Sequence, residues 1–413
     1  MAASPDVVVV GGGIAGCAAA YFLAREGAKV TLFEKDSVAS HASGFAFGGI
    51  LTKFGIEEGH PLYGLMHAAD RLHAELGETL AGESGVDPEY RRKAAVFLAM
   101  SQPEAESYRQ TYRQYARGFS SSEFPRPPEL VSGPGSGSGV RHSPTETSSS
   151  SGQRRALDIR WLGRGELSHI EARIAPQVIG GLYAGDSLEV EPYKLTLGLW
   201  QAAERRGARL VNRAVTGVIK SGGHVTGVQA GGEKLSAGAV VIAAGPWSAE
   251  AGKWLGMHIP VEPLKGQVLR LEAPEPPMEV SLWWAGDYAA SKPDGLVWVG
   301  TTEEHAGFDE TPTAAAREKI TASAVRALPY LRDAKLVKQT ACLRPLTPDR
   351  LPIVGTVPGL DGAVVATGAG RNGIELGPAM GLAAAELALG RKPSFDIGRL
   401  ALDRFYLPPG PSM

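Results

Sequence analysis

Two arginines, Arg344 and Arg371, lie in one segment near the C-terminal end of the sequence, CLRPLTPDRLPIVGTVPGLDGAVVATGAGRNGIELGPAMG, residues Cys342 to Gly381. A guanidinium group offers two parallel N–H donors and keeps its charge at any relevant pH, so an arginine in a cavity can hold and orient a carboxylate. Between the two arginines the sequence predicts a β-strand and a glycine-rich turn, which opens a helix near Ile374. The segment therefore predicts a site for a small ligand that carries a carboxylate.

A glycine motif stands at the start of the chain, where GGGIAG follows the apolar run Val7–Val10 and precedes the alanine-rich helix predicted over Ile14–Arg25. This G-x-G-x-x-G spacing permits a tight turn, a close approach of the backbone to a pyrophosphate, and packing of the helix on the strand. The N-terminus of the helix offers N–H groups and a partial positive charge to phosphates. The predicted contacts are Gly11, Gly13, Ile14, Ala15 and Gly16.

Glu34 ends the next predicted strand, Lys29–Glu34, and lies 18 residues after Gly16 (34 minus 16). A carboxylate at this place would accept a hydrogen bond from a ribose hydroxyl. The strand, helix and strand form a βαβ start that predicts a parallel sheet and a bound dinucleotide. The motif alone does not separate NAD from FAD.

The loop after Glu34, EKDSVASHASGFAFGGIL, is rich in serine and glycine, so its backbone amides can wrap a diphosphate and approach a flat ring. It resembles the second cofactor motif of the D-amino acid oxidase-like family of FAD-dependent oxidoreductases. A plain serine and glycine connection is the alternative that the residues leave open. By the resemblance, the cofactor contacts in this loop are Lys35, Ser43, Gly44, Gly48, Gly49 and Ile50.

Two more elements resemble the same family. VVIAAGPWS (240–248) is similar to the strand and turn that pass the cofactor a second time, with contacts at Ala244, Gly245 and Trp247. Val215 matches the position that touches the adenine through its backbone. With the glycine motif, these elements favour FAD.

The segment Cys342 to Gly381 resembles the glycine oxidase branch of this family, through LRPLTPDRLPIVG (343–355) and GAGRNGIELGP (368–378). PLKGQVLRL (263–271) and DYAASKPDGLVWVGTTEEHAGFD (287–309) agree with that branch as well. The resemblance covers most of the chain.

The resemblance implies that Arg344 binds the substrate carboxylate, that the hydroxyl of Tyr288 is a second donor to it, and that Arg371 lies near the ring and the substrate. From the residues alone, Arg344 could form a surface salt bridge and Tyr288 could be a core residue. Arg371 could contact a phosphate or a carbonyl within its own turn.

The helix that begins near Ile374 would direct its N-terminus at the pyrimidine edge of the flavin, which is anionic when reduced. No general base is needed if the substrate amine arrives neutral and its Cα hydride passes directly to the flavin, and none of the nine histidines stands out. The cofactor contacts predicted in this turn are Gly370, Arg371, Asn372, Gly373 and Ile374.

The sequence departs from the family pattern at two places. Ser291-Lys292 stands where the family usually has a proline-arginine pair, so the edge of the pocket and the identity of the substrate stay open. Cys342 lies close to where sarcosine oxidase relatives attach FAD covalently, although a buried, inert thiol is the more ordinary outcome. Trp283 and Trp284 could line the site or belong to an aromatic core.

The expected fold class is α/β, with a Rossmann-like FAD-binding βαβ domain interleaved in sequence with a β-rich α+β substrate domain. Residues 1–90, 176–262 and 335–413 are assigned to the FAD-binding domain, and residues 91–118, 156–175 and 263–334 to the substrate domain. The stretch 119–155 is rich in Ser, Gly and Pro and is predicted to be a disordered insertion.

The composition limits the partners. A net charge of -2 gives no sign of nucleic acid, and two distant cysteines argue against a disulfide and for a reducing compartment. No apolar run approaches the roughly 20 residues that span a bilayer, so a cytoplasmic protein is expected, with peripheral contact to a quinone pool left open. No metal site is expected, and the oligomeric state stays open, a homo-oligomer included.

The leading hypothesis from the sequence is an FAD-dependent oxidase of a small amine or amino acid such as glycine, sarcosine or a small D-amino acid. It would form an imine that hydrolyses, and O2 would reoxidise the flavin to give H2O2. The alternative is a dehydrogenase for amino or 2-hydroxy acids that uses a quinone or flavoprotein acceptor. A non-catalytic or NAD-binding protein is a third, less favoured hypothesis.

Overall fold

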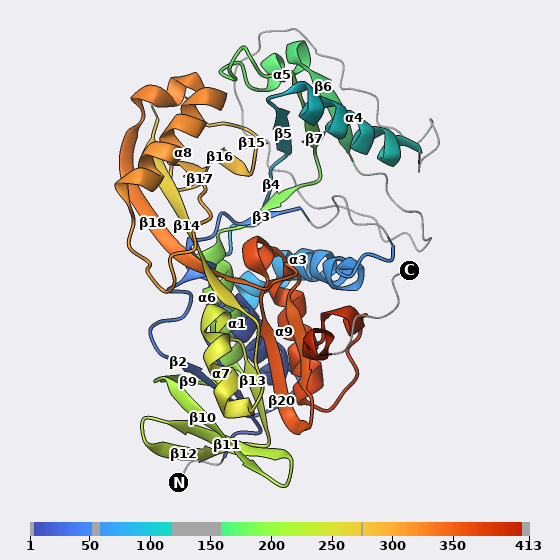
Figure 1. Ribbon diagram of the computed structural model, residues 1–413, viewed down its shortest axis with the longest axis vertical. Helices are drawn as coiled ribbons and strands as arrows, with labels where there is room; N and C mark the ends of the chain where they lie inside the picture. Colours follow the sequence, from blue (N-terminus) through green and yellow to red (C-terminus); the bar gives the residue numbers. More distant parts are fainter. Residues whose placement is uncertain (1–3, 52–57, 118–157, 274–275, 407–413) are drawn as a thin grey trace.

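The computed structural model describes residues 4–51, 58–117, 158–273 and 276–406, and these residues form two regions, each built on one large sheet (Figure 1). A nine-stranded sheet with its helices makes the lower region in the view of Figure 1, and an eight-stranded sheet makes the upper region. The predicted insertion at 119–155 lies outside the described residues.

The nine-stranded sheet has a parallel centre in the order β20-β13-β1-β2-β9, and β10, β11, β12 and β19 extend it. Residues of β1 alternate between two apolar clusters, Val7 and Val9 on one face and Val8 and Val10 on the other, so the strand is apolar throughout. The strands are β1 (Val7–Val10), β2 (Val30–Glu34), β9 (Arg209–Asn212), β10 (Val215–Ser221), β11 (His224–Ala230), β12 (Glu233–Ser236), β13 (Ala239–Ile242), β19 (Ile353–Val357) and β20 (Leu360–Thr367).

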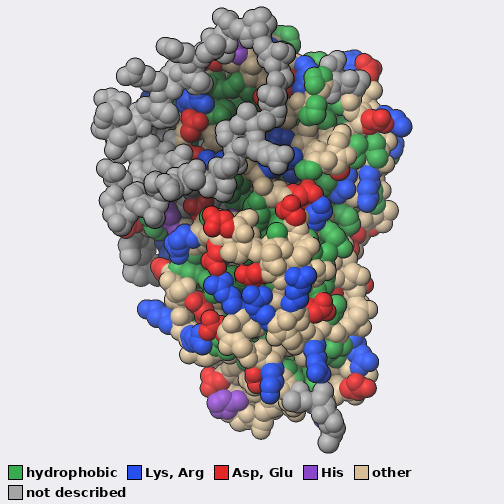
Figure 2. Space-filling view, turned by 180° about the vertical axis from the view of Figure 1, so that it is seen from behind, with side chains coloured by type: hydrophobic (Ala, Val, Ile, Leu, Met, Phe, Trp, Pro, Cys, Tyr) green, Lys and Arg blue, Asp and Glu red, His purple; other side chains and the backbone are tan. Residues whose placement is uncertain are grey.

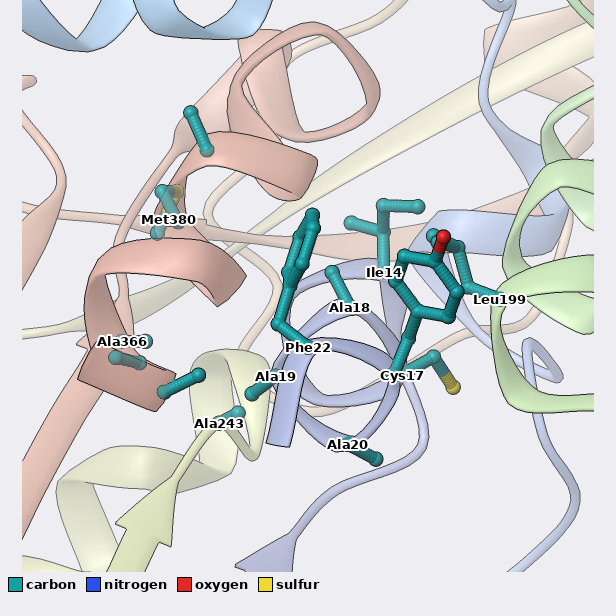
Figure 3. Close-up of a cluster of buried hydrophobic side chains, with 14 of the residues drawn as sticks. Ile14, Cys17, Ala18, Ala19, Ala20, Phe22, Leu199, Ala243, Ala366 and Met380 are labelled. Carbon is teal, nitrogen blue, oxygen red and sulfur yellow. The ribbon is translucent and has the colours of Figure 1, made fainter. Parts of the chain in front are cut away.

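Helices cover both faces of the parallel centre. One face packs against α1 (Ile14–Arg25), α3 (Tyr63–Ser84), α6 (Pro192–Arg205) and α9 (Gly373–Ala388). The other face packs against α7 (Ser248–Leu255). Figure 3 shows the first of these contacts, with small side chains of α1 allowing α9, which carries Met380, and α6, which carries Leu199, to approach closely.

The eight-stranded sheet has the order β18-β14-β17-β16-β15-β5-β7-β6 and is mostly antiparallel. Its apolar residues pack against α8 (Ala314–Ala327) and α5 (Arg164–Ile170), while α4 (Gln102–Arg117) lies over β5, β6 and β7. The strands are β5 (Ala95–Ala99), β6 (Ile159–Gly163), β7 (Gly180–Ala184), β14 (Glu262–Glu272), β15 (Ser281–Trp284), β16 (Asp287–Ser291), β17 (Val297–Gly300) and β18 (Lys335–Leu346).

A small sheet lies where the two regions meet (Figure 1). In it β8 (Leu188–Glu189) pairs with both β3 (Gly49–Ile50) and β4 (Arg91–Arg92). It joins the loop after β2 to the chain that enters the upper region.

The predicted α/β class with a parallel sheet is confirmed, and the predicted βαβ start matches the structure element by element. The sequence did not reveal β6, α5 or β7, because short strands with glycine at Gly163, Gly180 and Gly181 carry a weak periodic signal. The predicted division of the chain into two domains stays a proposal. The sheet to which each strand belongs suggests a different assignment for two strands. Both β7 and β18 pair within the eight-stranded sheet, although the sequence division placed them with the FAD-binding segments.

The surface seen in Figure 2 carries Lys and Arg side chains interspersed with Asp and Glu. Within the described part of the chain, no helix combines the length and the apolar character needed to cross a bilayer.

Candidate active site

A cavity of about 280 Å³ extends from the β1–α1 turn to β18, and we call it the main cavity because most of the predicted site residues line it. Its walls come from both regions of the molecule. The turn after β1, the loop after β2 and the turn after β13 line one part, and β16, β18 and the turn before α9 line the rest. All three predicted catalytic residues, Tyr288, Arg344 and Arg371, line this one cavity.

Two positions of the first turn require glycine, because a Cβ atom there would collide with nearby backbone atoms. A Cβ atom on Gly11, which has a φ of 108°, would lie 2.4 Å from the carbonyl oxygen of Ala243. A Cβ on Gly16 would lie 1.9 Å from the carbonyl oxygen of Gly11, so this glycine seats α1 against the strand. At the N-terminus of α1, the backbone N–H of Ile14 donates to Ser43 Oγ at 2.9 Å.

Glu34 is buried at the end of β2, where its carboxylate lines the main cavity. One carboxylate oxygen accepts from the backbone N–H of Gly12 at 2.6 Å, and the other accepts from that of Asp36 at 2.8 Å. These two bonds hold the carboxylate in one orientation. Its remaining lone pairs can accept from a hydroxyl group in the cavity.

Aromatic and charged side chains line the same end of the cavity. The Lys35 ammonium lies 3.8 Å from the centroid of a Trp247 ring, and the His41 ring lies 4.7 Å from it. His41 bridges two carboxylates, with Nε2 at 2.8 Å from Asp36 and Nδ1 at 3.0 Å from Glu310. No histidine stands out in the sequence, His41 included, because its partner Glu310 lies 269 residues away in the chain.

These residues fit an FAD molecule. Gly245 and Gly370 line the main cavity in the left-handed region, with φ of 53° and 54°, and a Cβ on either would meet no atom within 4 Å. They leave open backbone toward the cavity on two sides, as a bound flat ring or diphosphate requires. The seated helix N-terminus and the oriented carboxylate of Glu34 supply the donors and acceptors of a dinucleotide site.

Most predicted cofactor residues line the main cavity, and six do not. Contacts within the protein explain two of these six positions. A Cβ on Gly44 would lie 2.1 Å from the Ala39 carbonyl oxygen, and a Cβ on Gly48 would lie 2.2 Å from the Val190 carbonyl oxygen. The residues outside the lining are Gly16, Gly44, Gly48, Gly49, Ile50 and Asn372. The residues in the lining are Gly11, Gly13, Ile14, Ala15, Glu34, Lys35, Ser43, Val215, Ala244, Gly245, Trp247, Gly370, Arg371, Gly373 and Ile374.

Arg344 projects from β18 across the neighbouring strand β14. A Cβ on Gly266 would lie 2.2 Å from Arg344 Nη2, so the missing side chain at Gly266 provides the room for the guanidinium. Arg344 donates to the Thr302 carbonyl oxygen at 3.0 Å and to Thr301 Oγ1 at 2.7 Å. Among the residues that the structure describes, no carboxylate pairs with it. Two bonds leave donors of the guanidinium available to a ligand.

Tyr288 is buried on β16 and faces Gly300 of β17, where a Cβ would lie 2.7 Å from the phenolic oxygen. Burial raises the pKa of Tyr288 far above its ordinary value, although the positive charges of Arg344 and Arg371 oppose this shift. The phenol is therefore protonated at neutral pH and able to donate a hydrogen bond.

Arg371 lies in the short 3-10 helix Gly370–Asn372 that precedes α9. Its guanidinium donates to the Gly286 carbonyl oxygen at 2.6 Å and lies 3.4 Å from a carboxylate oxygen of Glu303. Gly286 belongs to the turn between β15 and β16, which carries Tyr288. Arg371 therefore connects the start of α9 to the turn between β15 and β16, and Tyr288 lies on β16.

Buried polar groups hold the first turn of α9 in place. His73 Nε2 lies 2.9 Å from the Glu375 carbonyl oxygen, so it donates, and Nδ1 accepts from the Tyr90 hydroxyl at 2.7 Å. Burial lowers the pKa of His73 to about 4, which keeps the ring neutral. Burial also raises the pKa of the Glu375 carboxyl to about 7, while its bond from the Leu51 N–H acts in the opposite direction.

The two departures from the family pattern have different surroundings. Cys342 lines the main cavity as a free, buried thiol, and burial raises its pKa, which disfavours the thiolate. Lys292 is buried behind the cavity wall beside Glu189. Of the two tryptophans, Trp283 lines the cavity and Trp284 belongs to the core of the upper region.

The chain is similar to known proteins over most of its length. The family described as FAD dependent oxidoreductase (DAO) matches residues 6–387. The chain is 32% identical over 402 residues to the glycine oxidase of Pseudomonas putida, covering 95% of this chain and 97% of that protein. It is 33% identical over 403 residues to the glycine oxidase of Pseudomonas aeruginosa, with 95% and 97% covered. The crystal structure of glycine oxidase from Geobacillus kaustophilus matches with a TM-score of 0.83 at 28% identity, covering 97% of this chain and 98% of that one.

Proposed function

The chain belongs to the DAO family of FAD-dependent oxidoreductases, and on this premise we propose that it oxidises the C–N bond of a small amino acid or amine. Glycine, sarcosine and small D-amino acids are the proposed substrates, the product is an imine that hydrolyses, and O2 is the proposed electron acceptor. The glycine oxidases among its relatives support this substrate class.

Arg344 carries the proposal. It is a partly buried cation in the main cavity whose hydrogen bonds go to Thr301 and Thr302 rather than to a carboxylate of the described residues. A buried charge that lacks a counter-ion is costly, so a ligand carboxylate is the natural partner. A bidentate pair with this carboxylate would fix the orientation of the substrate as well as its affinity.

Tyr288 would supply the second donor. Because its phenol stays protonated, it can donate to a carboxylate lone pair that the bidentate pair with Arg344 leaves free. With Phe47 and Trp283, which also line the cavity, it forms an aromatic wall that excludes water from the reacting atoms. Dry surroundings strengthen the pair between the guanidinium and the carboxylate.

Bound FAD supplies a two-electron acceptor for the Cα hydride of the substrate. The residues of this chain would orient the Cα–N bond and would favour the neutral amine, since the cavity already carries two guanidinium groups, of Arg344 and Arg371. The N-terminus of α9 faces the cavity through Gly373 and Ile374, and its partial positive charge would stabilise the negative charge that develops on reduction.

An anaerobic screen against the absorption band of the bound flavin tests this proposal. Glycine, sarcosine or a small D-amino acid should bleach the band, whereas 2-hydroxy acids should not. Bleaching by 2-hydroxy acids alone would contradict the proposal. Admission of air should restore the band within seconds, and a reduced flavin that persists for minutes in air would replace the oxidase with a dehydrogenase.

A further inference from the structure

The segment Gly44–Phe47 separates the main cavity from a second cavity of about 510 Å³. Phe45 lines both cavities, Phe47 lines the main cavity, and Lys292 lines the second one. This short stretch of chain therefore lies between the two cavities, and a group that holds its backbone can influence the shape of the main cavity.

Lys292 holds that backbone directly. Its ammonium donates to the Phe47 carbonyl oxygen at 2.6 Å, and it lies 4.2 Å from the centroid of the Phe47 ring. The same ammonium lies 3.3 Å from Glu189 Oε2, and only 8% of the residue is exposed. A charged donor in such dry surroundings makes a strong and directional bond.

The Phe47 ring packs against two other aromatic rings of the main cavity. Its centroid lies 4.3 Å from that of Tyr288 and 5.1 Å from that of Trp283, and the last two rings are 5.3 Å apart. All three rings line the main cavity. A shift of the Phe47 backbone would therefore move the wall against which the Tyr288 phenol is packed.

Stability alone does not account for this lysine. Glu189 is already paired with Arg91 at 2.6 Å and accepts from Ser281 Oγ at 2.5 Å. The buried Lys93 is a third cation near Glu189, so Arg91, Lys93 and Lys292 all act on this one carboxylate. Burial lowers the pKa of Lys292, which means that keeping its charge there costs free energy. An apolar side chain of the same length would fill the space, but it would leave the Phe47 carbonyl without its donor.

We propose that Lys292 is a positioning residue that fixes the Phe47 wall and thereby restricts the substrate to small amines. This inference rests on the proposed function for its substrate class. It assigns a role to the lysine at the place where the chain departs from the proline-arginine pair of the family.

Lys292→Met tests the inference in the FAD-loaded protein, with acetate as the probe and the flavin spectrum as the readout. We expect acetate to bind about tenfold more weakly, because the Tyr288 phenol loses its support. We also expect the ratio of kcat/KM for N-ethylglycine to that for sarcosine to rise several-fold. Lys292→Arg should restore both values, since a guanidinium can donate to the same carbonyl.

Lys93→Met is the matched control, because Lys93 belongs to the same buried group but donates to the Ser291 carbonyl oxygen at 2.6 Å instead of to Phe47. It should lower thermal stability to a similar degree and leave acetate affinity and the amine ratio unchanged. Equal effects of the two methionine substitutions on acetate and on the ratio would overturn the inference.

Phe47→Leu keeps the buried charges and shortens the wall, so it serves if Lys292→Met does not fold. It should raise the same amine ratio, and an unchanged ratio would overturn the inference. An unaltered protein that binds acetate and oxidises no amine refutes the proposed function, while the acetate comparison still decides the role of Lys292.

Discussion

Arg344 and Arg371 line the same cavity and lie 27 residues apart (371 minus 344) in one segment of the sequence, yet their surroundings differ. Arg344 donates to a backbone carbonyl and a hydroxyl, whereas Arg371 has the carboxylate of Glu303 and the Gly286 carbonyl as partners. A cation whose charge is already compensated has less to gain from a ligand carboxylate. The difference identifies Arg344 as the proposed substrate anchor and Arg371 as a connection between α9 and the β15–β16 turn.

The largest expected effect follows removal of the anchor. Arg344→Ala should raise the KM for the amino acid by about 100-fold or more, since a buried carboxylate would lose its partner. Steady-state kinetics would measure this, with FAD content and Tm as controls for folding. An unchanged KM would remove Arg344 from the site and would end the comparison.

Gly266→Ala should produce the next largest effect without touching the arginine itself. The new Cβ would lie 2.2 Å from Arg344 Nη2, so the guanidinium must move away from its hydrogen bonds with Thr301 and Thr302. We expect about a tenfold rise in KM, as a small displacement costs part of the bidentate geometry. Gly165→Ala is the matched control, because a Cβ there meets no atom within 4 Å, and its KM should not change.

Arg371→Met should change KM less than about threefold, because its present partners are protein groups. The expected loss is in thermal stability, and Glu303→Gln should cause a similar loss because it breaks the same pair. Differential scanning fluorimetry and KM would be compared for both variants. A rise in KM equal to that of Arg344→Ala would show that the two arginines act as a pair on the substrate.

The smallest expected effect concerns Glu375, in the turn of α9 next to Arg371. Burial raises the pKa of this carboxyl from its ordinary value of 4.5 to about 7, so the folded protein holds a proton that the unfolded chain releases. The stability from this proton is complete below about pH 4.5 and is lost as pH rises through about 7. Glu375→Gln should therefore match the unaltered protein near pH 5 and melt a few degrees higher at pH 8. Parallel Tm curves across this range would contradict the shift.

The sequence was sufficient for the features that depend on neighbours in the chain. The strand Val7–Val10, the glycine turn and the helix Ile14–Arg25 are predicted by local patterns, and the structure has the same bounds. The confirmed family resemblance likewise rests on contiguous motifs.

The partners of the arginines could not be predicted, because they depend on which strands pair. Thr301 and Thr302 reach Arg344 through the order β18-β14-β17, and Glu303 reaches Arg371 across 68 residues. The meaning of Gly266 depends on the same register, which places it beside Cys342 and under the Arg344 guanidinium. No local pattern of residues encodes a register between distant strands.

The order of strands in the nine-stranded sheet has a consequence for folding kinetics. Its central strand β1 pairs with β13, which begins at Ala239, and β13 in turn pairs with β20, which begins at Leu360. Contacts between such distant residues form slowly, since long loops must close before they contribute stability. The main cavity is complete only after these pairings form, so FAD should bind late and should slow unfolding more than it speeds folding.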